Sequence, residues 1–246
     1  MNILITAGGT SEKVDCIRSI TNRSTGEMAR QIAEEYERRN DNIHFFYICS
    51  ENAKLPQVSN ILIYRIKSVL DLEKVLNDLL SNYKFDIIIH AMAVSDYTVD
   101  GVFSEHKIKE VIKNAADKTL NTVDSDLINK NKIDSDHDYI YLRLKRTPKI
   151  IELFRKMQPE TILVGFKLLV NSSINNLIQA GYHILKNNRC NFVFANDLNE
   201  IKDEKHKGIL IDENKKTQIT LSKKDAARCI VSSTLKCITQ CRSHTN

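Results

Sequence analysis

The sequence predicts an α/β fold built on a mainly parallel sheet, because apolar runs alternate with amphipathic stretches. The first apolar run, Asn2–Thr6, is followed by a helical pattern over Gly26–Arg38 and by a second run over Ile43–Cys49. An amphipathic stretch at Val69–Leu80 then leads to Phe85–Ala93, which is nearly all apolar, as expected for a central strand covered on both faces. This strand–helix–strand–helix–strand order predicts parallel pairing with right-handed crossovers.

The second half of the chain continues the pattern. Further strands are predicted at Tyr139–Leu144, Thr161–Lys167 and Asn191–Ala195. One helix is predicted to begin at Pro148 with Thr147 as its N-cap, and another to span Asn171–Asn187 with Ser172 or Ser173 as its cap.

The C-terminal part predicts a hairpin followed by a helix. Gly208–Asp212 and Thr217–Leu221 flank a polar turn, and Ser222 and Asp225 stand at capping-box spacing before a helix that runs to about Lys236. We therefore expect a single domain over residues 1–246, folded as a Rossmann-like three-layer sandwich with a mainly parallel sheet.

Residues 99–137 differ from the rest, since they are rich in Lys, Asp, Asn and Ser. We expect a long, mobile polar loop here, with one marginal helix near Glu105–Ala116. Loops of this length in compact domains are commonly functional.

Composition excludes several classes of function. The 246 residues are 42% hydrophobic and 27% charged, which suits a soluble domain with a substantial core. The net charge of +5 is spread along the chain, which favours an anionic small substrate over nucleic acid. There is no membrane-spanning run and no secretion-signal pattern, so we expect a cytoplasmic protein with no membrane partner. The six cysteines form no C-x-x-C pair, and we expect them to be reduced and to hold no metal.

Polar residues follow the ends of the predicted strands. The first strand ends at Gly8 and Gly9, where backbone can approach a ligand closely, although G-x-G-x-x-G spacing is absent. Ser24, Thr25 and Gly26 stand at a predicted helix N-terminus, which favours a phosphate or another anion. Each feature taken alone also fits a capped helix or an ordinary turn.

Three further residues have a similar double interpretation. Arg18 offers a forked donor for phosphate or carboxylate. Asp96 follows the central strand and is suited to accept hydrogen bonds from two ribose hydroxyls, or to cap a turn. Lys107 lies in the polar stretch, either as a solvated surface residue or as part of a loop that closes over a triphosphate.

The motifs together resemble those of phosphopantothenate–cysteine ligases. The opening signature of that family is similar to Thr6–Thr10, Glu12 and Val14–Gly26 of this chain. The later motifs of the family resemble Ala93–Tyr97, Lys107–Lys109, Arg146–Ile150, Val164–Phe166 and Ala195–Asp197, in the same order. The resemblance covers most of the chain, which is most similar in organisation to the stand-alone bacterial ligases.

The resemblance implies a two-step reaction. The carboxylate of 4′-phosphopantothenate attacks a nucleoside triphosphate, usually CTP in bacterial members and ATP in eukaryotic ones, and pyrophosphate leaves. The amine of L-cysteine then displaces the nucleoside monophosphate. Mg²⁺ is carried by the nucleotide rather than by a metal site of the protein.

The resemblance also implies roles for particular residues. Asn22 contacts the acyl group, Arg18 lies near the substrate, and Lys107 is essential for nucleotide use. The nucleotide-binding set it implies is Met92, Ala93, Asp96, Lys107, Arg146, Thr147, Pro148, Lys149 and Phe166. Backbone of Met92 and Ala93 is expected to contact the base or ribose. Gly8, Gly9, Ser24, Thr25 and Gly26 form the expected substrate and phosphate site.

The chain departs from the family pattern in places. Two helix lysines that touch the triphosphate in many members correspond to Ile184 and Asn188, with Lys186 between them as a candidate substitute. The polar stretch over residues 110–138 is longer than usual, so the sequence leaves CTP and ATP both open. Members of the family act as homodimers, and Tyr139–Leu144 is a candidate for pairing between subunits.

Two alternatives remain at the level of sequence. Tyr182 and Lys186 stand at the Y-x-x-x-K spacing of short-chain NAD(P)-dependent dehydrogenases, though without a dinucleotide glycine pattern. A non-catalytic nucleotide-binding module would tolerate the loss of Asn22 and Lys107, and both are present.

Overall fold

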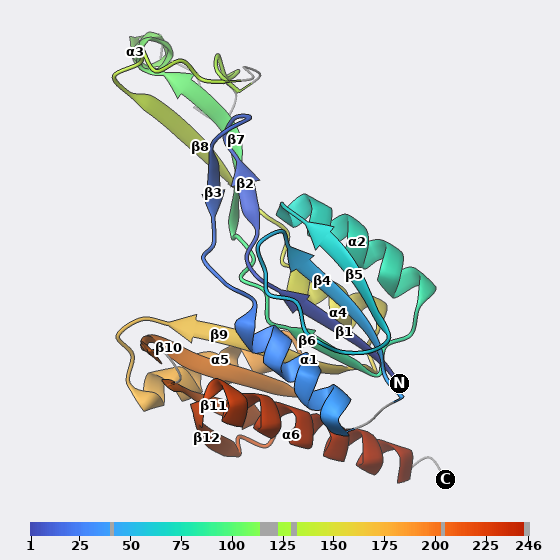
Figure 1. Ribbon diagram of the computed structural model, residues 1–246. Coiled ribbons are helices and arrows are strands. Elements are labelled where there is room, and N and C mark those ends of the chain that lie inside the picture. Colours follow the sequence, from blue (N-terminus) through green and yellow to red (C-terminus); the bar gives the residue numbers. More distant parts are fainter. Residues whose placement is uncertain (40–41, 114–122, 129–131, 203–204, 244–246) are drawn as a thin grey trace.

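The computed structural model is a three-layer α/β sandwich from which a narrow arm projects (Figure 1). It describes residues 1–39, 42–113, 123–128, 132–202 and 205–243. The central sheet has eight strands in the order β12-β11-β10-β9-β6-β1-β4-β5. The predicted fold class is confirmed.

Six strands of the sheet are parallel, and two antiparallel strands complete one edge. The parallel strands are β1 (Asn2–Ala7), β4 (His44–Ser50), β5 (Ile61–Ile66), β6 (Ile87–His90), β9 (Ile162–Leu169) and β10 (Phe192–Lys202). The antiparallel pair is β11 (Lys205–Asp212) and β12 (Thr217–Ser222), which is the predicted hairpin.

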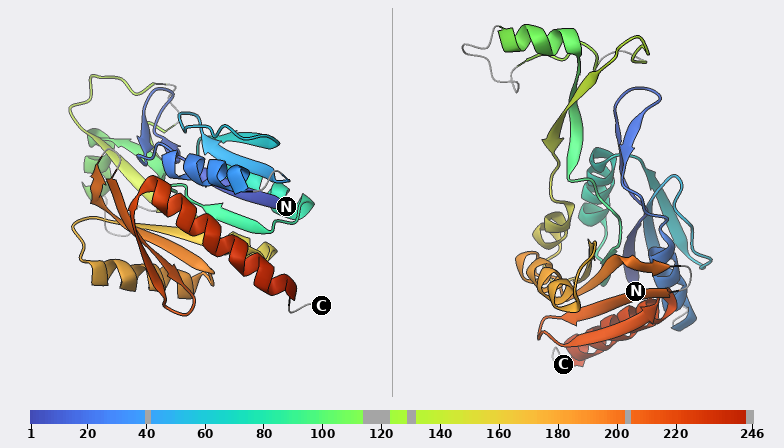
Figure 2. Two further views of the ribbon diagram at one scale, coloured as in Figure 1. Left: turned by 60° about the horizontal axis from the view of Figure 1, so that its bottom comes forward. Right: turned by 90° about the vertical axis from the view of Figure 1, so that its left-hand side faces the viewer.

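Helices cover both faces of the sheet (Figures 1 and 2). One face carries α1 (Glu27–Arg39) and α6 (Lys223–Ser243), and the other carries α2 (Val69–Asn82), α4 (Ile150–Met157) and α5 (Ile174–Asn187). Side chains alternate along the strands, so Ile3 and Ile5 pack toward α1 and α6 while Leu4 packs toward α2. Burial on both faces explains why the central strands are continuously apolar.

The arm leaves the sheet at the carboxyl ends of the parallel strands (Figures 1 and 2). It consists of the antiparallel pair β7 (Tyr97–Ser104) and β8 (Ile140–Arg146), with α3 (Glu105–Lys113) at its far end. A small hairpin of β2 (Ser11–Lys13) and β3 (Ser19–Thr21) lies against its lower part. A separate small core fills this contact, formed by Val14, Val102, Leu127 and Ile133.

The arm corrects the prediction of a long loop over 99–137. Residues 99–104 belong to a strand paired with β8, and the predicted helix near Glu105 is observed as α3. Residues 114–122 and 129–131 of that stretch lie outside the described residues. The segment between Gly9 and Gly26 contains the β2–β3 hairpin.

The predicted helix caps differ in outcome. The Ser173 side chain accepts from the backbone N–H of Asn176, and the Ser222 side chain accepts from that of Asp225, which confirms both caps. The predicted cap at Thr147 is wrong, because α4 begins at Ile150 and the Thr147 hydroxyl instead donates to the carbonyl of Ser95. In the part of the chain that is described, no helix is long and apolar enough to cross a membrane.

Candidate functional site

Two loops at the carboxyl edge of the sheet are joined through Thr10. The backbone N–H of Thr10 donates to the carbonyl of Ala93 (3.1 Å), and its carbonyl accepts from the N–H of Asn22 (3.1 Å). Its Oγ1 accepts from the N–H of Ser95 (2.9 Å). Asn22 and Asp96 therefore come from loops that are hydrogen-bonded to the same buried residue.

The glycine pair after β1 is packed against the chain's own atoms. Gly8 has φ +83°, and a Cβ there would lie 2.0 Å from Ser50 Oγ. A Cβ on Gly9 would lie 2.0 Å from the carbonyl oxygen of Asn22. We predicted that a ligand would lie close to this backbone, but Ser50 and Asn22 of the protein itself lie there. The close packing places Asn22 against the end of β1.

The N–H groups of the loop after β6 are already used. That of Ala93 donates to the carbonyl of Gly8 (2.9 Å), and that of Met92 donates to Thr6 Oγ1 (3.3 Å). These two residues consequently have no N–H to offer to a base or ribose without local rearrangement, and any backbone contact would use their carbonyls. Thr6 Oγ1 also lies 2.9 Å from Nδ1 of buried His90, and burial lowers the pKa of His90 to about 4.

Asp96 stands exposed at the root of the arm. Its Oδ1 accepts from Lys149 Nζ at 2.5 Å, while its carbonyl accepts from the N–H of Thr147. The structure therefore brings together Asp96, Thr147 and Lys149 of the predicted nucleotide-binding set. Arg146 and Pro148 flank them with exposed side chains, and Tyr97 pairs with Arg146 across the arm.

Arg18 lies at the tip of the β2–β3 hairpin. Its Nη1 donates to Asp15 Oδ2 (2.7 Å) and to the carbonyl of Ile133 (3.2 Å). Asp15 is fully covered, and hydrogen bonds from the N–H groups of Arg18 and then Ile17 hold its pKa at about 2. This pairing fastens the hairpin tip to the arm and separates Arg18 from Asn22 by the length of β3.

Lys107 lies on α3, at the far end of the arm. Its Nζ pairs with Glu110 Oε2 at 3.1 Å. Because β7 separates it from Asp96, the rise of a strand puts the two residues about 20 Å or more apart within one chain. The structure thus does not bring Lys107 to the Asn22 and Asp96 loops of its own chain.

The N-terminus of α1 contains a carboxylate that the sequence interpretation did not weigh. Ser24, Thr25 and Gly26 precede this helix as predicted, and Gly26 has φ +71°. Hydrogen bonds from Arg30, and then from Lys54, hold the pKa of Glu27 at about 2, so it is ionised at neutral pH. The two cations offset this charge beside the expected phosphate site.

The remaining predicted residues lie at different places along the sheet. Phe166, near the middle of β9, packs its ring against Phe194 (5.7 Å between centroids). Ile184 and Asn188 lie at the end of α5 that adjoins the amino end of β10, and Asn188 is the C-cap. A lysine at either position, or Lys186 between them, would therefore lie at the opposite edge of the sheet from Asn22.

Tyr182 is also distant from the carboxyl edge. It lies on α5 and packs, partly buried, against the core cluster, and Lys215 Nζ lies 4.5 Å from its ring centroid. Lys215 belongs to the β11–β12 turn, next to the amino end of β10. This position does not suit the Y-x-x-x-K pair for proton donation to a ligand at the carboxyl edge.

Glu12 is a buried polar residue to which the sequence assigned no role of its own. It is only 3% exposed, and its two oxygens accept from the N–H of Val69 (2.9 Å) and from Thr98 Oγ1 (2.7 Å). Glu12 thereby ties the hairpin to the N-terminus of α2 and to the root of the arm. The place of Glu12 in the opening motif is a signal in the sequence. Its hydrogen-bond donors are far away along the chain, so residue spacing does not identify them.

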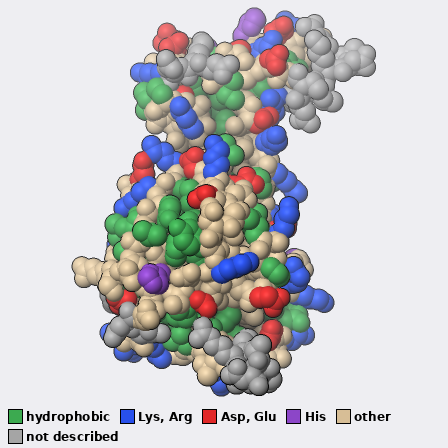
Figure 3. Space-filling view, turned by 90° about the vertical axis from the view of Figure 1, so that its right-hand side faces the viewer, with side chains coloured by type: hydrophobic (Ala, Val, Ile, Leu, Met, Phe, Trp, Pro, Cys, Tyr) green, Lys and Arg blue, Asp and Glu red, His purple; other side chains and the backbone are tan. Residues whose placement is uncertain are grey.

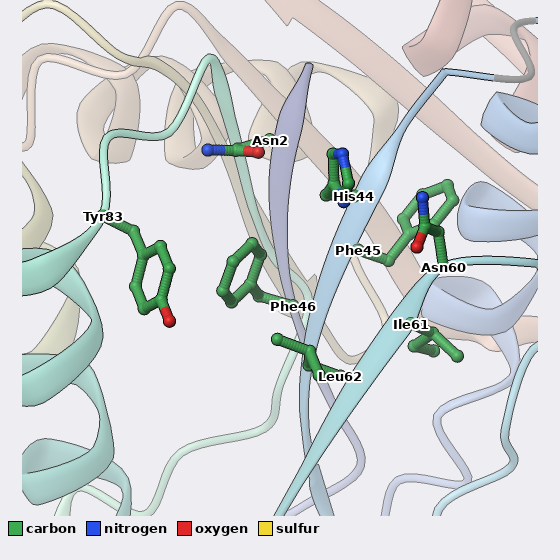
Figure 4. Close-up of a pocket in the computed structure, with 8 residues that line it drawn as sticks. All are labelled: Asn2, His44, Phe45, Phe46, Asn60, Ile61, Leu62 and Tyr83. Carbon is green, nitrogen blue, oxygen red and sulfur yellow. The ribbon is translucent and has the colours of Figure 1, made fainter.

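A cavity of about 640 Å³ opens elsewhere, at the amino ends of β1, β4 and β5 (Figure 4). Its lining is Asn2, His44, Phe45, Phe46, Asn60, Ile61, Leu62 and Tyr83. It contains none of the predicted site residues. Because ligands of open α/β sheets bind at the carboxyl ends of strands, we assign the site to the opposite edge. There, Lys and Arg side chains lie among Asp and Glu side chains where the arm meets the body, and the basic side chains are available to anionic substrates (Figure 3).

A known protein family matches most of the chain. Residues 1–130 and 111–237 match the family described as the DNA/pantothenate metabolism flavoprotein C-terminal domain. This chain belongs to that family. The match spans the opening motif, the arm and the parallel strands.

Relatives in this flavoprotein C-terminal family are longer proteins. The coenzyme A biosynthesis bifunctional protein CoaBC of Thermococcus kodakarensis is 31% identical over 209 residues, covering 85% of this chain and 44% of that protein. Its counterpart in Methanocaldococcus jannaschii is 28% identical over 244 residues, covering 96% of this chain and 51% of that protein. The chain thus spans about half the length of these curated relatives.

Solved structures share the fold. The DNA/pantothenate metabolism flavoprotein from Streptococcus pneumoniae has a TM-score of 0.82 at 32% identity, covering 95% of this chain and 97% of that chain. A Cab2 mutant in complex with phosphopantothenate-cysteine has a TM-score of 0.72 at 15% identity, covering 99% of this chain and 88% of that chain. At that identity the second likeness concerns the fold alone.

Proposed function

We propose that this chain is a phosphopantothenate–cysteine ligase that joins L-cysteine to 4′-phosphopantothenate, with CTP as the favoured nucleotide. The observation that carries the proposal is the convergence of the Asn22 and Asp96 loops on Thr10 at the carboxyl edge of the sheet. Membership of the flavoprotein C-terminal family and likeness to proteins of coenzyme A biosynthesis support it.

The first step activates a carboxylate. An oxygen of the 4′-phosphopantothenate carboxylate bonds to the α-phosphorus of the nucleotide, and the bond from that phosphorus to the bridging oxygen breaks. Pyrophosphate leaves with the electron pair. The step is needed because a free carboxylate is a poor acyl donor, whereas an acyl-nucleotide carries a good leaving group.

The second step forms the amide. The amine of cysteine bonds to the acyl carbon, the bond from that carbon to the phosphate oxygen breaks, and the amine loses a proton. The side-chain amide of Asn22 donates to the acyl oxygen, where negative charge develops. Positioning of the two reactants supplies a further part of the rate.

Nucleotide binding is assigned to the root of the arm. Asp96 accepts from the ribose hydroxyls, Lys149 beside it is available to phosphate, and the Arg146–Lys149 segment and Phe166 line the pocket. Phosphate of the acyl substrate binds near Ser24, Thr25 and Gly26. We assign Mg²⁺ to the triphosphate oxygens of the nucleotide, where its charge offsets part of theirs.

We propose that the chain acts as a homodimer and that the arm forms part of the interface. Strand β8 exposes a run of large apolar side chains, namely Ile140, Tyr141, Leu142 and Leu144, next to exposed Tyr139. Such a surface is suited to cover by a second copy of the chain. We infer that Lys107, and Arg18 with it, serve the site of the partner subunit in such a dimer, because Lys107 is remote from Asn22 of its own chain.

A pyrophosphate-release assay tests the proposed function. Purified protein would be given phosphopantothenate, cysteine and Mg²⁺ with each of the four nucleoside triphosphates in turn. We expect release with CTP, and none when phosphopantothenate is omitted. Absence of release with all four nucleotides would contradict the proposal, while release with ATP alone would correct the nucleotide. A cytoplasmic location stays a prediction.

A further inference from the structure

Thr10 has a different environment from the residues assigned to substrates. Its side chain is fully buried, so it cannot touch a ligand. Its N–H, its carbonyl and its Oγ1 are bonded to Ala93, Asn22 and Ser95, respectively. One residue thus fixes the backbone of the loop that carries Asn22 and that of the loop that carries Asp96.

The Ser95 peptide group is held from two sides. Thr10 Oγ1 accepts from the N–H of Ser95 at 2.9 Å, and the carbonyl of Ser95 accepts from Thr147 Oγ1 at 2.6 Å. The next carbonyl, of Asp96, accepts from the N–H of Thr147 at 3.1 Å. The Asp96 side chain is therefore presented to solvent from a backbone that Thr10 and Thr147 hold on either side.

We propose that Thr10 is a positioning residue that sets the placement of the Asp96 nucleotide subsite relative to Asn22. The inference rests on the proposed function, in which the acyl-nucleotide joins these two subsites. Acyl transfer requires the acyl carbon and the nucleotide to be held at a fixed separation, and small misplacements of reacting groups lower rates strongly. The Thr10 hydroxyl supplies the side-chain bond between the loops.

The test replaces the hydroxyl without changing the size of the side chain. Thr10→Val removes the acceptor for the Ser95 N–H, whereas Thr10→Ser keeps it. Thr161→Val is a matched control, because Thr161 is also buried and its hydroxyl donates to the carbonyl of Phe85 (2.7 Å) at the amino edge of the sheet. The nucleotide KM, kcat and calorimetric nucleotide affinity would be measured for each variant below its unfolding temperature.

We expect Thr10→Val to lower kcat/KM by about 100-fold, with a raised nucleotide KM, and Thr10→Ser to stay within about threefold of the native protein. Combined with Asp96→Asn, Thr10→Val should add little, because it acts through the same loop. Thr161→Val should lower the unfolding temperature without changing KM or kcat.

The outcomes separate the two proposals. Thr10→Val with native KM and kcat and only a lower unfolding temperature would overturn the inference and leave the proposed function intact. A native protein that makes no product would overturn the proposed function, and the positioning role with it. Where Thr10→Val does not fold, Thr10→Ala at low temperature gives the same comparison against Thr10→Ser.

Discussion

Asn22 is fixed through its backbone, with its N–H on the Thr10 carbonyl and its carbonyl against Gly9. That leaves the half-buried side chain to act on substrate. We predict that Asn22→Asp slows the second step by about 100-fold or more, because a donor to the developing oxyanion is replaced by a negative charge. The acyl-nucleotide should then accumulate.

Rapid-quench measurement of pyrophosphate and product would check this. Pyrophosphate should be released in a burst of one per site, followed by slow product formation. Asn214→Asp in the exposed β11–β12 turn makes the same chemical change as a control. Equal slowing of both steps in Asn22→Asp would assign Asn22 to substrate binding instead.

Asp96 permits a test of ribose recognition. If its carboxylate accepts from the ribose hydroxyls, the native enzyme should prefer a ribonucleotide over its 2′-deoxy analogue. We predict that Asp96→Asn raises the nucleotide KM by about 10-fold to 100-fold, the range expected when a charged hydrogen-bond partner is lost. The preference over the deoxy analogue should fall with it. A variant that binds more weakly but keeps the full preference would place the ribose elsewhere.

The sequence could indicate candidate site residues only where they belong to a recognisable motif. The resemblance named Asn22, Asp96, Thr147 and Lys149, and these do come from loops joined at one edge. It could not reveal that Thr10 joins them, because the three hydrogen-bond partners of Thr10 are spread over residues 22–95. Tertiary hydrogen bonding of this kind leaves no periodic signal.

At the scale of elements, the arm was the largest difference from expectation. Strand β7 pairs with β8 across about 35 intervening residues, and such non-local pairing cannot be read from local propensity. Strand β8 was predicted because its alternating apolar residues are a local signal. The edge strand β5 was not predicted, although it extends the sheet beside β4.

The arm yields a prediction about subunit mixing. Asn22→Asp and Lys107→Gln should each be nearly inactive as homodimers, the second because the acyl-nucleotide does not form. If Lys107 serves the partner's site, a heterodimer of the two variants contains one site with both native residues. An equal mixture after subunit exchange should therefore recover about a quarter of native activity.

The control mixes Asn22→Asp with Lys113→Gln, which changes an exposed lysine at the end of the same helix. Because Lys113→Gln is expected to be active alone, its mixture should show no gain over the average of the two. If the Lys107→Gln mixture gains nothing although light scattering shows exchanged dimers, Lys107 acts within its own chain or not at all. A monomer at micromolar concentration would contradict the homodimer itself.

At the scale of the whole molecule, the sheet was predictable because burial on both faces produces continuous apolar runs. The polar contacts between the layers were not predictable from the sequence. Arg155 is 8% exposed and donates to the carbonyls of Arg189, Pro159 and Thr161 and to Asn191 Oδ1. It joins α4 to the starts of β9 and β10, and burial lowers its pKa.

We predict that Arg155→Met lowers the free energy of unfolding by about 3 kcal/mol, because several buried acceptors lose their donor. Urea denaturation would measure this, with exposed Arg228→Met as the control. A loss below about 1 kcal/mol would mean that water satisfies these acceptors instead.

His90, on the central strand β6, makes the stability of the protein depend on pH. Its folded pKa of about 4 lies below the ordinary value of 6.5, because burial disfavours the imidazolium. Between these values the unfolded chain binds a proton that the folded chain does not, so stability is complete above about pH 6.5 and falls as the pH drops toward 4. The loss approaches about 3 kcal/mol at the lower limit.

Replacing this imidazole should flatten the pH dependence. Asp15 and Glu27, with pKa values of about 2, lose their stabilisation mainly below pH 4, while His206, with a pKa of about 4, titrates in the same window as His90. His90→Asn should therefore reduce the slope between pH 6 and 4.5 by about 1.4 kcal/mol per pH unit, leaving the His206 contribution. Urea denaturation at each pH would give the free energy of unfolding. If its plots against pH run parallel for His90→Asn and the native protein over this range, His90 takes up its proton in the folded state and the prediction is wrong.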